Sequence, residues 1–154
     1  MPQTRRTILA FALALPVLVA IERPAFAEQP AVFAPDGLAI SGYDPVLYLT
    51  ENRAQPGKPE FALEWHGASW RFASAETLTA FEMNPKAYAP QYGGYCAYAV
   101  SKGALATSDP EAFTVWNGRL YLNYSADVRT IWREDIAGNV EKADGHWPAV
   151  LRSE

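Results

Sequence analysis

The clearest pattern in the sequence is a pair of short alternating runs that occurs twice. Residues 61–65 and 70–73 alternate aromatic with small or polar positions around a turn at residues 66–69, which predicts a β-hairpin. Residues 113–116 and 119–123 do the same around Asn117-Gly118, a dipeptide that favours a tight type I′ turn. A serine suited to cap a helix follows each hairpin, at Ser74 and Ser125.

Apolar positions at helical spacing follow both serines. Leu78 and Phe81 share one face of a helix over residues 75–83, which Asn84-Pro85 ends. After the second serine, Val128, Ile131, Trp132 and Ile136 recur three and four residues apart, and we expect Gly138 to break this helix before a last helical piece over residues 140–151. A short helix over residues 97–102 ends at Gly103.

The remaining stretches are less regular. Residues 28–35 predict a loose lead-in with one short strand near Val32-Phe33, and residues 38–48 begin with a second short strand. A polar loop fills residues 51–60, and no internal repeat is visible. The pattern predicts a small single α+β domain with two β-hairpins, a short helix after each hairpin region and a C-terminal helical segment.

The first 27 residues have the pattern of an export signal. Arg5-Arg6 precedes an apolar run over residues 8–21 and a small-x-small site that ends at Ala27. The arginine pair suits both a twin-arginine signal and the ordinary secretory route. We therefore expect a signal peptide over residues 1–27, a folded domain over residues 28–154, and a periplasmic or secreted protein without stable membrane insertion after cleavage.

Charge narrows the choice of partners. The chain has 13 basic and 17 acidic residues. Loss of Arg5, Arg6, Arg23 and Glu22 with the signal leaves 10 basic and 16 acidic residues, a formal charge of −6. An acidic surface without basic blocks argues against nucleic acid as a partner. The one cysteine cannot form a disulfide within its own chain, so stability must come from the core.

Residues 90–98 form the densest candidate site. This run, Pro-Gln-Tyr-Gly-Gly-Tyr-Cys-Ala-Tyr, places two glycines and three tyrosines around Cys96. Three interpretations of Cys96 stay open, namely a small buried residue, a ligand of a metal or cofactor, and a reactive thiol. Tyr43, Asp44, Tyr92 and Tyr95 are candidates to line a pocket, although Asp44 before a proline also fits a helix cap.

The sequence favours no enzyme class. Catalysis by a cysteine nucleophile requires a base, and only His66 and His146 are available. A nucleophile-elbow serine, a phosphate loop and a dinucleotide fingerprint are all missing from the sequence. We therefore expect a protein that binds and does not catalyse.

The motifs Asp44-Pro45-Val46, Trp70-Arg71-Phe72-Ala73-Ser74 and Asn84-Pro85-Lys86-Ala87-Tyr88, together with Phe81, resemble the YHS domain. Three further motifs in order, Ile40-Ser41-Gly42-Tyr43-Asp44-Pro45-Val46, Tyr88 to Ala97 and Gly118-Arg119-Leu120-Tyr121-Leu122-Asn123, resemble the exported bacterial YHS-domain proteins. The resemblance covers nearly all of the chain after the signal. It implies a YHS-type fold and a role in handling a metal ion, copper or zinc.

The resemblance also shows where this chain departs from the metal-transporter form of the domain. The two positions that usually hold cysteine ligands there are Leu47 and Ala73 here, and neither side chain coordinates a metal. Cys96 is then the first candidate ligand, with His66 as a weaker one. The alternative function is an accessory module that binds a small molecule or a protein partner through its aromatic surface, with Cys96 purely structural.

Overall fold

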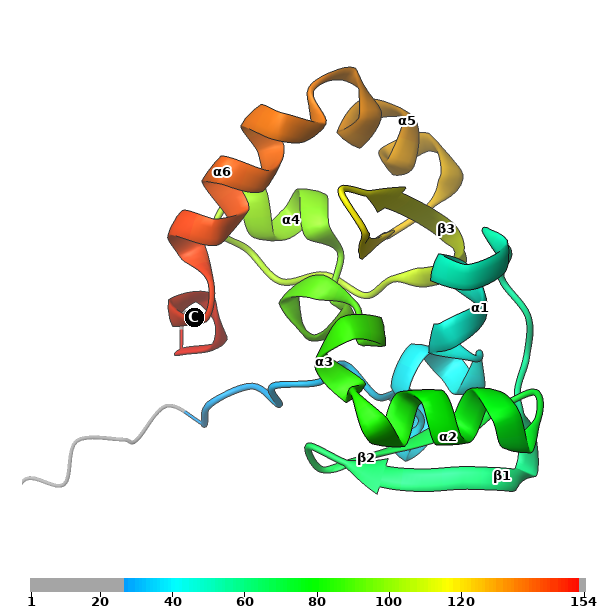
Figure 1. Cartoon of the computed structure of the whole chain (residues 1–154). Coiled ribbons are helices and arrows are strands. Elements are labelled where there is room, and N and C mark those ends of the chain that lie inside the picture. The colour runs from blue at the N-terminus through cyan, green and yellow to red at the C-terminus, as the bar shows by residue number, and fades with distance from the viewer. Residues whose placement is uncertain (1–26, 153–154) are drawn as a thin grey trace, which may run out of the picture.

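The computed structural model describes residues 27–152 and has a mixed α+β fold, which confirms the predicted class (Figure 1). The predicted export signal lies outside the described residues except for Ala27. The helices and strands are α1 (Pro45–Glu51), β1 (Lys58–Trp65), β2 (Ala68–Phe72), α2 (Ala75–Met83), α3 (Pro85–Tyr88), α4 (Ala97–Ser101), β3 (Asp109–Trp116), β4 (Arg119–Asn123), α5 (Ala126–Glu134) and α6 (Ile136–His146). Single turns of 3-10 helix occur at η1 (Pro35–Gly37), η2 (Ala39–Gly42), η3 (Gln91–Gly94) and η4 (Ala149–Arg152).

Both predicted hairpins are present, and both turn in the same way. β1 pairs antiparallel with β2, and β3 pairs antiparallel with β4. Asn117 and Gly118 have φ of 48° and 70°, the two positive angles that a type I′ turn requires. His66 and Gly67 have φ of 51° and 76°, so the first hairpin turns alike without an asparagine.

The two serine caps also form as predicted. The Ser74 hydroxyl accepts a hydrogen bond from the Thr77 N–H, and the Ser125 hydroxyl accepts one from the Val128 N–H. Each cap satisfies a backbone donor that the first turn of a helix leaves without a partner. The direction in which each helix leaves its hairpin is therefore set locally.

The structure contains a repeat that the sequence does not reveal. Strands β3 and β4 begin at residues 109 and 119 and helix α5 at residue 126, each 51 residues after β1 (58), β2 (68) and α2 (75). The strand pairing is interrupted at matching places, between Lys58 and Ala62 and between Asp109 and Phe113. We call residues 39–88 the first unit and residues 91–146 the second unit.

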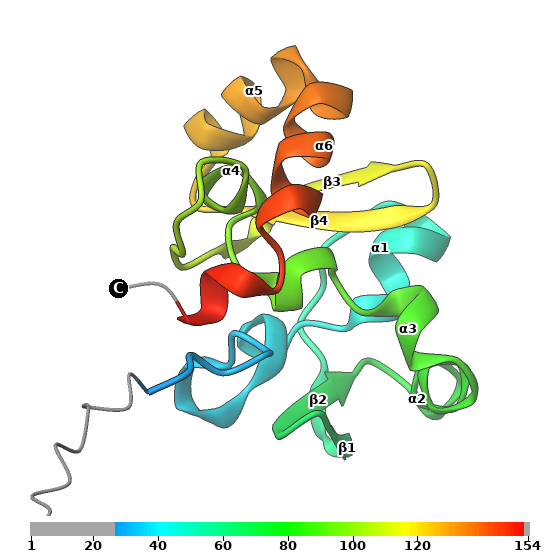
Figure 2. The ribbon, with the colours of Figure 1, turned by 90° about the vertical axis from the view of Figure 1, so that its left-hand side faces the viewer.

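Strand β4 separates two hydrophobic cores. Leu120 and Leu122 pack into the core of the first unit together with Trp70 and Phe72. Tyr121, between them in sequence, packs on the other side into the core of the second unit. Successive residues of a strand point to opposite faces, so one strand contributes to both cores. In Figure 2 the β3–β4 hairpin lies above α1, α2 and α3, with α4 beside it and α5 above it.

Three predictions at the chain level are wrong. Gly138 does not break a helix, because α6 runs through it and begins after Asp135, whose carboxylate accepts a hydrogen bond from the Gly138 N–H at 3.0 Å. Val32-Phe33 forms no strand, because the chain bends at Val32 and neither residue pairs with a strand among the described residues. The strand expected from Leu38 is reduced to one bridge, between Leu38 and Ser69, before η2 begins.

Candidate binding site

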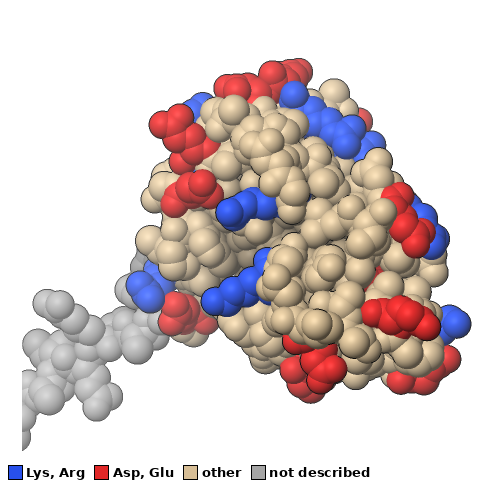
Figure 3. All heavy atoms as spheres, viewed as in Figure 1, with Lys and Arg blue, Asp and Glu red and all other residues tan. Residues whose placement is uncertain are grey.

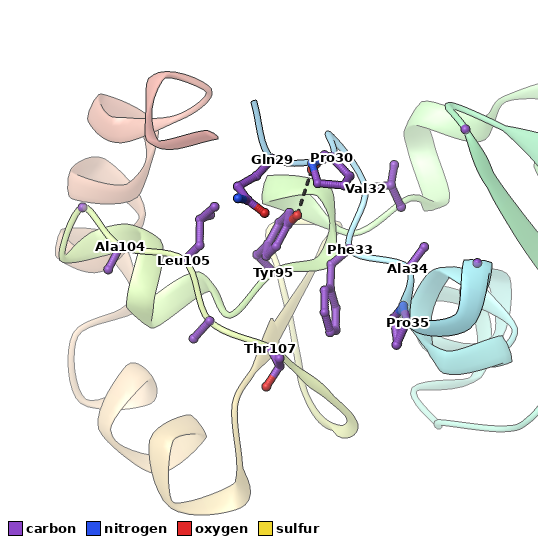
Figure 4. A pocket seen from close by; sticks show the side chains of 14 residues that line it. Gln29, Pro30, Val32, Phe33, Ala34, Pro35, Tyr95, Ala104, Leu105 and Thr107 are labelled. Carbon is purple, nitrogen blue, oxygen red and sulfur yellow. Dashed lines mark hydrogen bonds between the residues drawn. The ribbon is translucent and has the colours of Figure 1, made fainter. Parts of the chain in front are cut away.

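The larger of two cavities among the described residues lies between two irregular segments. One is the N-terminal arm, residues 28–35, and the other is the 103–107 loop that follows α4. The cavity has a volume of about 720 Å³, and Figure 4 shows Tyr95 between the two segments. Its walls are formed by Gln29, Pro30, Val32, Phe33, Ala34, Pro35, Gly37, Gly67, Tyr95, Gly103, Ala104, Leu105, Ala106 and Thr107. None of these side chains carries a formal charge at neutral pH.

Tyr95 holds the N-terminal arm at this cavity. Its hydroxyl donates a hydrogen bond to the Pro30 carbonyl oxygen at 2.9 Å, and its ring centroid lies 5.4 Å from that of Phe33. Burial raises the pKa of the Tyr95 hydroxyl above its usual value. The hydroxyl is therefore a neutral donor at any physiological pH.

The glycine pair before Tyr95 allows the arm to approach closely. The Phe33 N–H donates a hydrogen bond to the Gly93 carbonyl oxygen at 2.9 Å. Gly93 has a φ of 62°, and a Cβ at this position would collide with the Ala31 carbonyl oxygen. Only glycine combines this backbone angle with this contact. The density of glycines near Cys96 thus serves the docking of the arm.

Cys96 is buried behind Tyr95 and lines neither cavity described here. Its side chain is 1% exposed, and the Asn123 amide nitrogen lies 3.9 Å from the sulfur. The Cys96 N–H donates to the Ala106 carbonyl oxygen at 3.0 Å, which fixes the base of the 103–107 loop. Of the three interpretations of this cysteine, the small buried residue agrees best with these contacts.

Asp44 has the capping role that Asp-Pro predicts. One carboxylate oxygen accepts a hydrogen bond from the Val46 N–H and the other accepts one from the Ala73 N–H, both at 2.8 Å. The residue is fully buried. Because both oxygens are engaged by backbone donors, Asp44 ties the start of α1 to the end of β2.

The four residues predicted to share a pocket lie in different places. Tyr95 lines the large cavity, whereas Tyr43 and Asp44 line neither cavity, and the Tyr43 hydroxyl donates to a Glu111 carboxylate oxygen at 3.1 Å. Tyr92 lines a second cavity of about 340 Å³, and its hydroxyl donates to the Asp144 carboxylate at 2.8 Å. The pocket that the sequence suggested is thus distributed over three sites.

His66 also lines the second cavity, where it lies in the β1–β2 turn with its ring stacked on Trp65 at a centroid distance of 3.9 Å. Cys96 does not line this cavity. Within residues 27–152 no three histidine, cysteine or acidic side chains converge as a metal ion requires. The structure therefore does not bring the two predicted metal ligands into one cluster.

Sequence reasoning missed both segments that enclose the large cavity. The arm was interpreted as a loose lead-in and the loop only as the end of a helix. One signal was available, because residues 29–35 and 103–107 contain no charged side chain in an otherwise acidic chain. Uncharged irregular segments of this kind are unusual on a surface exposed to water.

Comparison with known proteins finds no match to this chain. No family model matches it, and neither a curated protein nor a solved structure matches it. Over the described residues, none of the helices has both the length and the apolar character that a membrane span requires. The resemblance to exported YHS-domain proteins accordingly stays a prediction from sequence motifs.

Proposed function

We propose that this protein is an exported, non-catalytic binding module that holds a neutral, largely apolar ligand in the cavity beside Tyr95. The observation that carries this proposal is the cavity itself, at about 720 Å³ between the N-terminal arm and the 103–107 loop. Sites for small molecules usually measure roughly 300–1,000 Å³ and combine apolar walls with few polar groups. The polar side chains here are Gln29, Tyr95 and Thr107.

The absence of charge in the walls supports the choice of ligand. A charged ligand in an apolar site would lose hydration without gaining an ion pair, which is costly. The acidic and basic side chains on the face in Figure 3 are interspersed and separated by neutral surface. A neutral ligand with one or two hydrogen-bonding groups fits these walls best.

The proposal can be tested with a neutral, environment-sensitive fluorophore such as phenylnaphthylamine. We expect saturable binding with enhanced emission, and weakening by about tenfold or more in Thr107→Asp, because that change places a carboxylate in the cavity. Thr107 is exposed enough to tolerate the change. Thr79→Asp, at an exposed position on α2, is the matched control and should bind as the wild type does. If both variants bound the fluorophore equally well, the cavity beside Tyr95 would not be its binding site.

Metal handling, which the YHS resemblance implies, remains a separate prediction. Its test is titration of the protein with Cu(I), Cu(II) and Zn(II) under anaerobic conditions, compared with Cys96→Ser. Stoichiometric binding that the variant loses would support a thiolate ligand. Equal binding, or none in either protein, would exclude Cys96 as a ligand.

A further inference from the structure

Two tyrosines in this chain bind two proline-containing segments in the same way. The Tyr48 hydroxyl donates to the Pro110 carbonyl oxygen at 2.8 Å, and the Tyr95 hydroxyl donates to the Pro30 carbonyl oxygen at 2.9 Å. Proline restricts φ and lacks an N–H, which favours an extended segment whose carbonyl groups are free to accept. The same hydrogen bond, from a tyrosine hydroxyl to a proline carbonyl oxygen, therefore occurs twice in the chain.

The contact continues three residues further along each segment. Phe113 follows Pro110 by three positions, and its ring lies 5.0 Å from that of Tyr48. Phe33 follows Pro30 by the same interval, and its ring lies 5.4 Å from that of Tyr95. Aromatic pairs at these distances are favourable. The recognised pattern is thus a proline, two further residues and a phenylalanine, in contact with one tyrosine.

The two proline-containing segments are held in place by different contacts. Pro110 belongs to β3, which β4 holds by strand pairing. Pro30 and Ala31 are exposed and belong to no strand. Beyond the turn that follows it, where Gly37 and Leu38 donate to Ala34 and Pro35, the arm has two backbone hydrogen bonds, from the Gln29 N–H to Leu151 and from the Phe33 N–H to Gly93. Glu28 also forms an exposed ion pair with Arg152, and Val32 packs into the core of the first unit. The contact at Tyr95 is therefore the one that can exchange.

The arm also leaves room beside it. Between its proline and phenylalanine lie the small residues Ala31 and Val32, of which Val32 lines the large cavity and Ala31 only the second cavity. Across the cavity, the N–H groups of Leu105 and Thr107 donate no hydrogen bond within the described chain. A peptide with larger side chains would fill the cavity and could pair with these donors.

We propose that Tyr95 and the 103–107 loop form a docking site for an extended, uncharged segment of a partner protein with a proline followed three residues later by an aromatic residue. This inference rests on the proposed function, since it names the class of ligand that the cavity takes. The N-terminal arm is the competing occupant from the same chain. Displacing the arm exchanges one tyrosine contact for another of the same kind, and the partner's larger side chains add the burial that the arm lacks.

The test is a binding measurement with a fluorescein-labelled peptide of sequence Gln-Pro-Leu-Leu-Phe-Ala. Phe33→Ala should raise the apparent affinity by about fivefold or more, because it weakens the competing arm and enlarges the fraction of free sites. Phe33→Ala/Tyr95→Phe should bind the peptide about fivefold more weakly than Phe33→Ala, because the second change removes one hydrogen bond to the peptide where the arm no longer competes strongly. Tyr43→Phe, which removes an exposed hydroxyl in the first unit, is the matched control.

A peptide with alanine in place of phenylalanine should lose most of the binding, and circular dichroism of each variant checks that it is folded. If Phe33→Ala binds the peptide as the wild type does, and Phe33→Ala/Tyr95→Phe binds it as Phe33→Ala does, the docking site is refuted. If Phe33→Ala instead forms a dimer in sedimentation while the peptide fails to bind, the occupant is a second copy of the chain and the partner proposal is overturned.

The neutral fluorophore separates this inference from the proposed function. Binding of the fluorophore that responds to Thr107→Asp, combined with no binding of the peptide, would leave the cavity as a small-molecule site and overturn the peptide inference alone. Failure of both ligands would overturn both proposals. Displacement of the fluorophore by the peptide is the result expected if both are correct.

Discussion

Asp44 in the first unit and Cys96 in the second occupy equivalent positions but contribute differently to their units. Each follows a glycine and a tyrosine, Gly42-Tyr43 and Gly94-Tyr95, and each precedes a short helix. The Asp44 N–H donates to Gln55 at 2.9 Å and the Cys96 N–H donates to Ala106 at 3.0 Å. The backbones agree, yet the carboxylate accepts two backbone hydrogen bonds while the thiol caps nothing.

The segments that follow the two short helices also differ, and again the one in the first unit is bound more closely. In the first unit, Tyr43 forms a bridge with Pro56, and the Gly57 N–H donates to Gly42 at 2.8 Å. In the second unit, the Ser108 hydroxyl donates to the Gly94 carbonyl oxygen instead, at 2.6 Å. The chain closes tightly over Tyr43, whereas the large cavity lies beside Tyr95. The two units thus share a backbone arrangement, but the following segment packs directly against Tyr43 in the first unit and leaves a cavity beside Tyr95 in the second.

The largest expected effect is at Asp44. Asp44→Ala leaves the N–H groups of Val46 and Ala73 without their acceptor, and we expect a loss of about 3–5 kcal/mol in the free energy of unfolding. Cys96→Ala removes only a small buried group and should cost about 1 kcal/mol. Urea denaturation measures both, and Glu82→Ala, at an exposed position on α2, is the control. Equal losses of unfolding free energy in Asp44→Ala and Cys96→Ala would contradict the inference that the two residues contribute differently to their units.

A smaller loss is expected at Gly93. Gly93→Ala places a methyl group against the Ala31 carbonyl oxygen and should cost about 2–4 kcal/mol, since it combines a positive φ with displacement of the arm. Gly67→Ala is the matched control, because it has a φ of 76° and no atom within 4 Å, and it should cost about 1 kcal/mol. Limited proteolysis should cleave the arm faster only in Gly93→Ala. Similar behaviour of both variants would show that the arm is not held there.

Alkaline pH should weaken both units through buried tyrosines. Burial is the main cause that raises the pKa of Tyr48 in the first unit and of Tyr92 in the second, and the Asp144 carboxylate adds to it at Tyr92. Both hydroxyls ionise near pH 10 in the unfolded chain and higher in the folded one. Stability should therefore be constant below about pH 9 and fall above pH 10, by about 1.4 kcal/mol per pH unit for Tyr48.

Tyr48→Phe and Tyr92→Phe should each reduce this slope, and Tyr124→Phe, at an exposed position, should leave it unchanged. Urea midpoints between pH 8 and about pH 11 give the slope. A flat stability profile in the wild type would contradict the burial of these two hydroxyls.

The last prediction concerns the accessibility of the Cys96 thiol and involves no loss of stability. Because Cys96 is 1% exposed, we expect its reaction with a thiol reagent to be slower than that of the urea-unfolded chain by about 100-fold or more. Addition of the reagent at a series of urea concentrations locates the transition. Rapid reaction without urea would restore the interpretation of Cys96 as a reactive thiol.

Local features of the fold could be predicted because single residues determine them. Asn117-Gly118 specifies its turn, Ser74 and Ser125 specify their helix starts, and Asp44 before a proline specifies a cap. Gly138 does not end the helix, because its cost of about 1 kcal/mol in α6 is offset by the Asp135 cap, and a Cβ at position 138 would collide with the capping carboxylate.

The repeat and the cavity could not be predicted, because both depend on contacts between distant residues. The equivalent core positions hold Trp70 and Tyr121, or Phe81 and Trp132, so the aromatic character is kept while the residues change. The cavity exists because residues 28–35 lie across from residues 103–107. No local sequence pattern predicts how far apart these two segments lie in the folded protein. Tyr95 lines the cavity, but its hydrogen-bond partner Pro30 lies 65 residues away in the sequence.

The position of β4 has a consequence for how the two units depend on each other. Its leucines complete one core and its tyrosine the other, so cutting the chain between the units would leave the first half without Leu120 and Leu122. Either fragment made alone would expose apolar surface and be prone to aggregate. Although the architecture is duplicated, its halves are not interchangeable modules, and the whole chain should melt in a single transition.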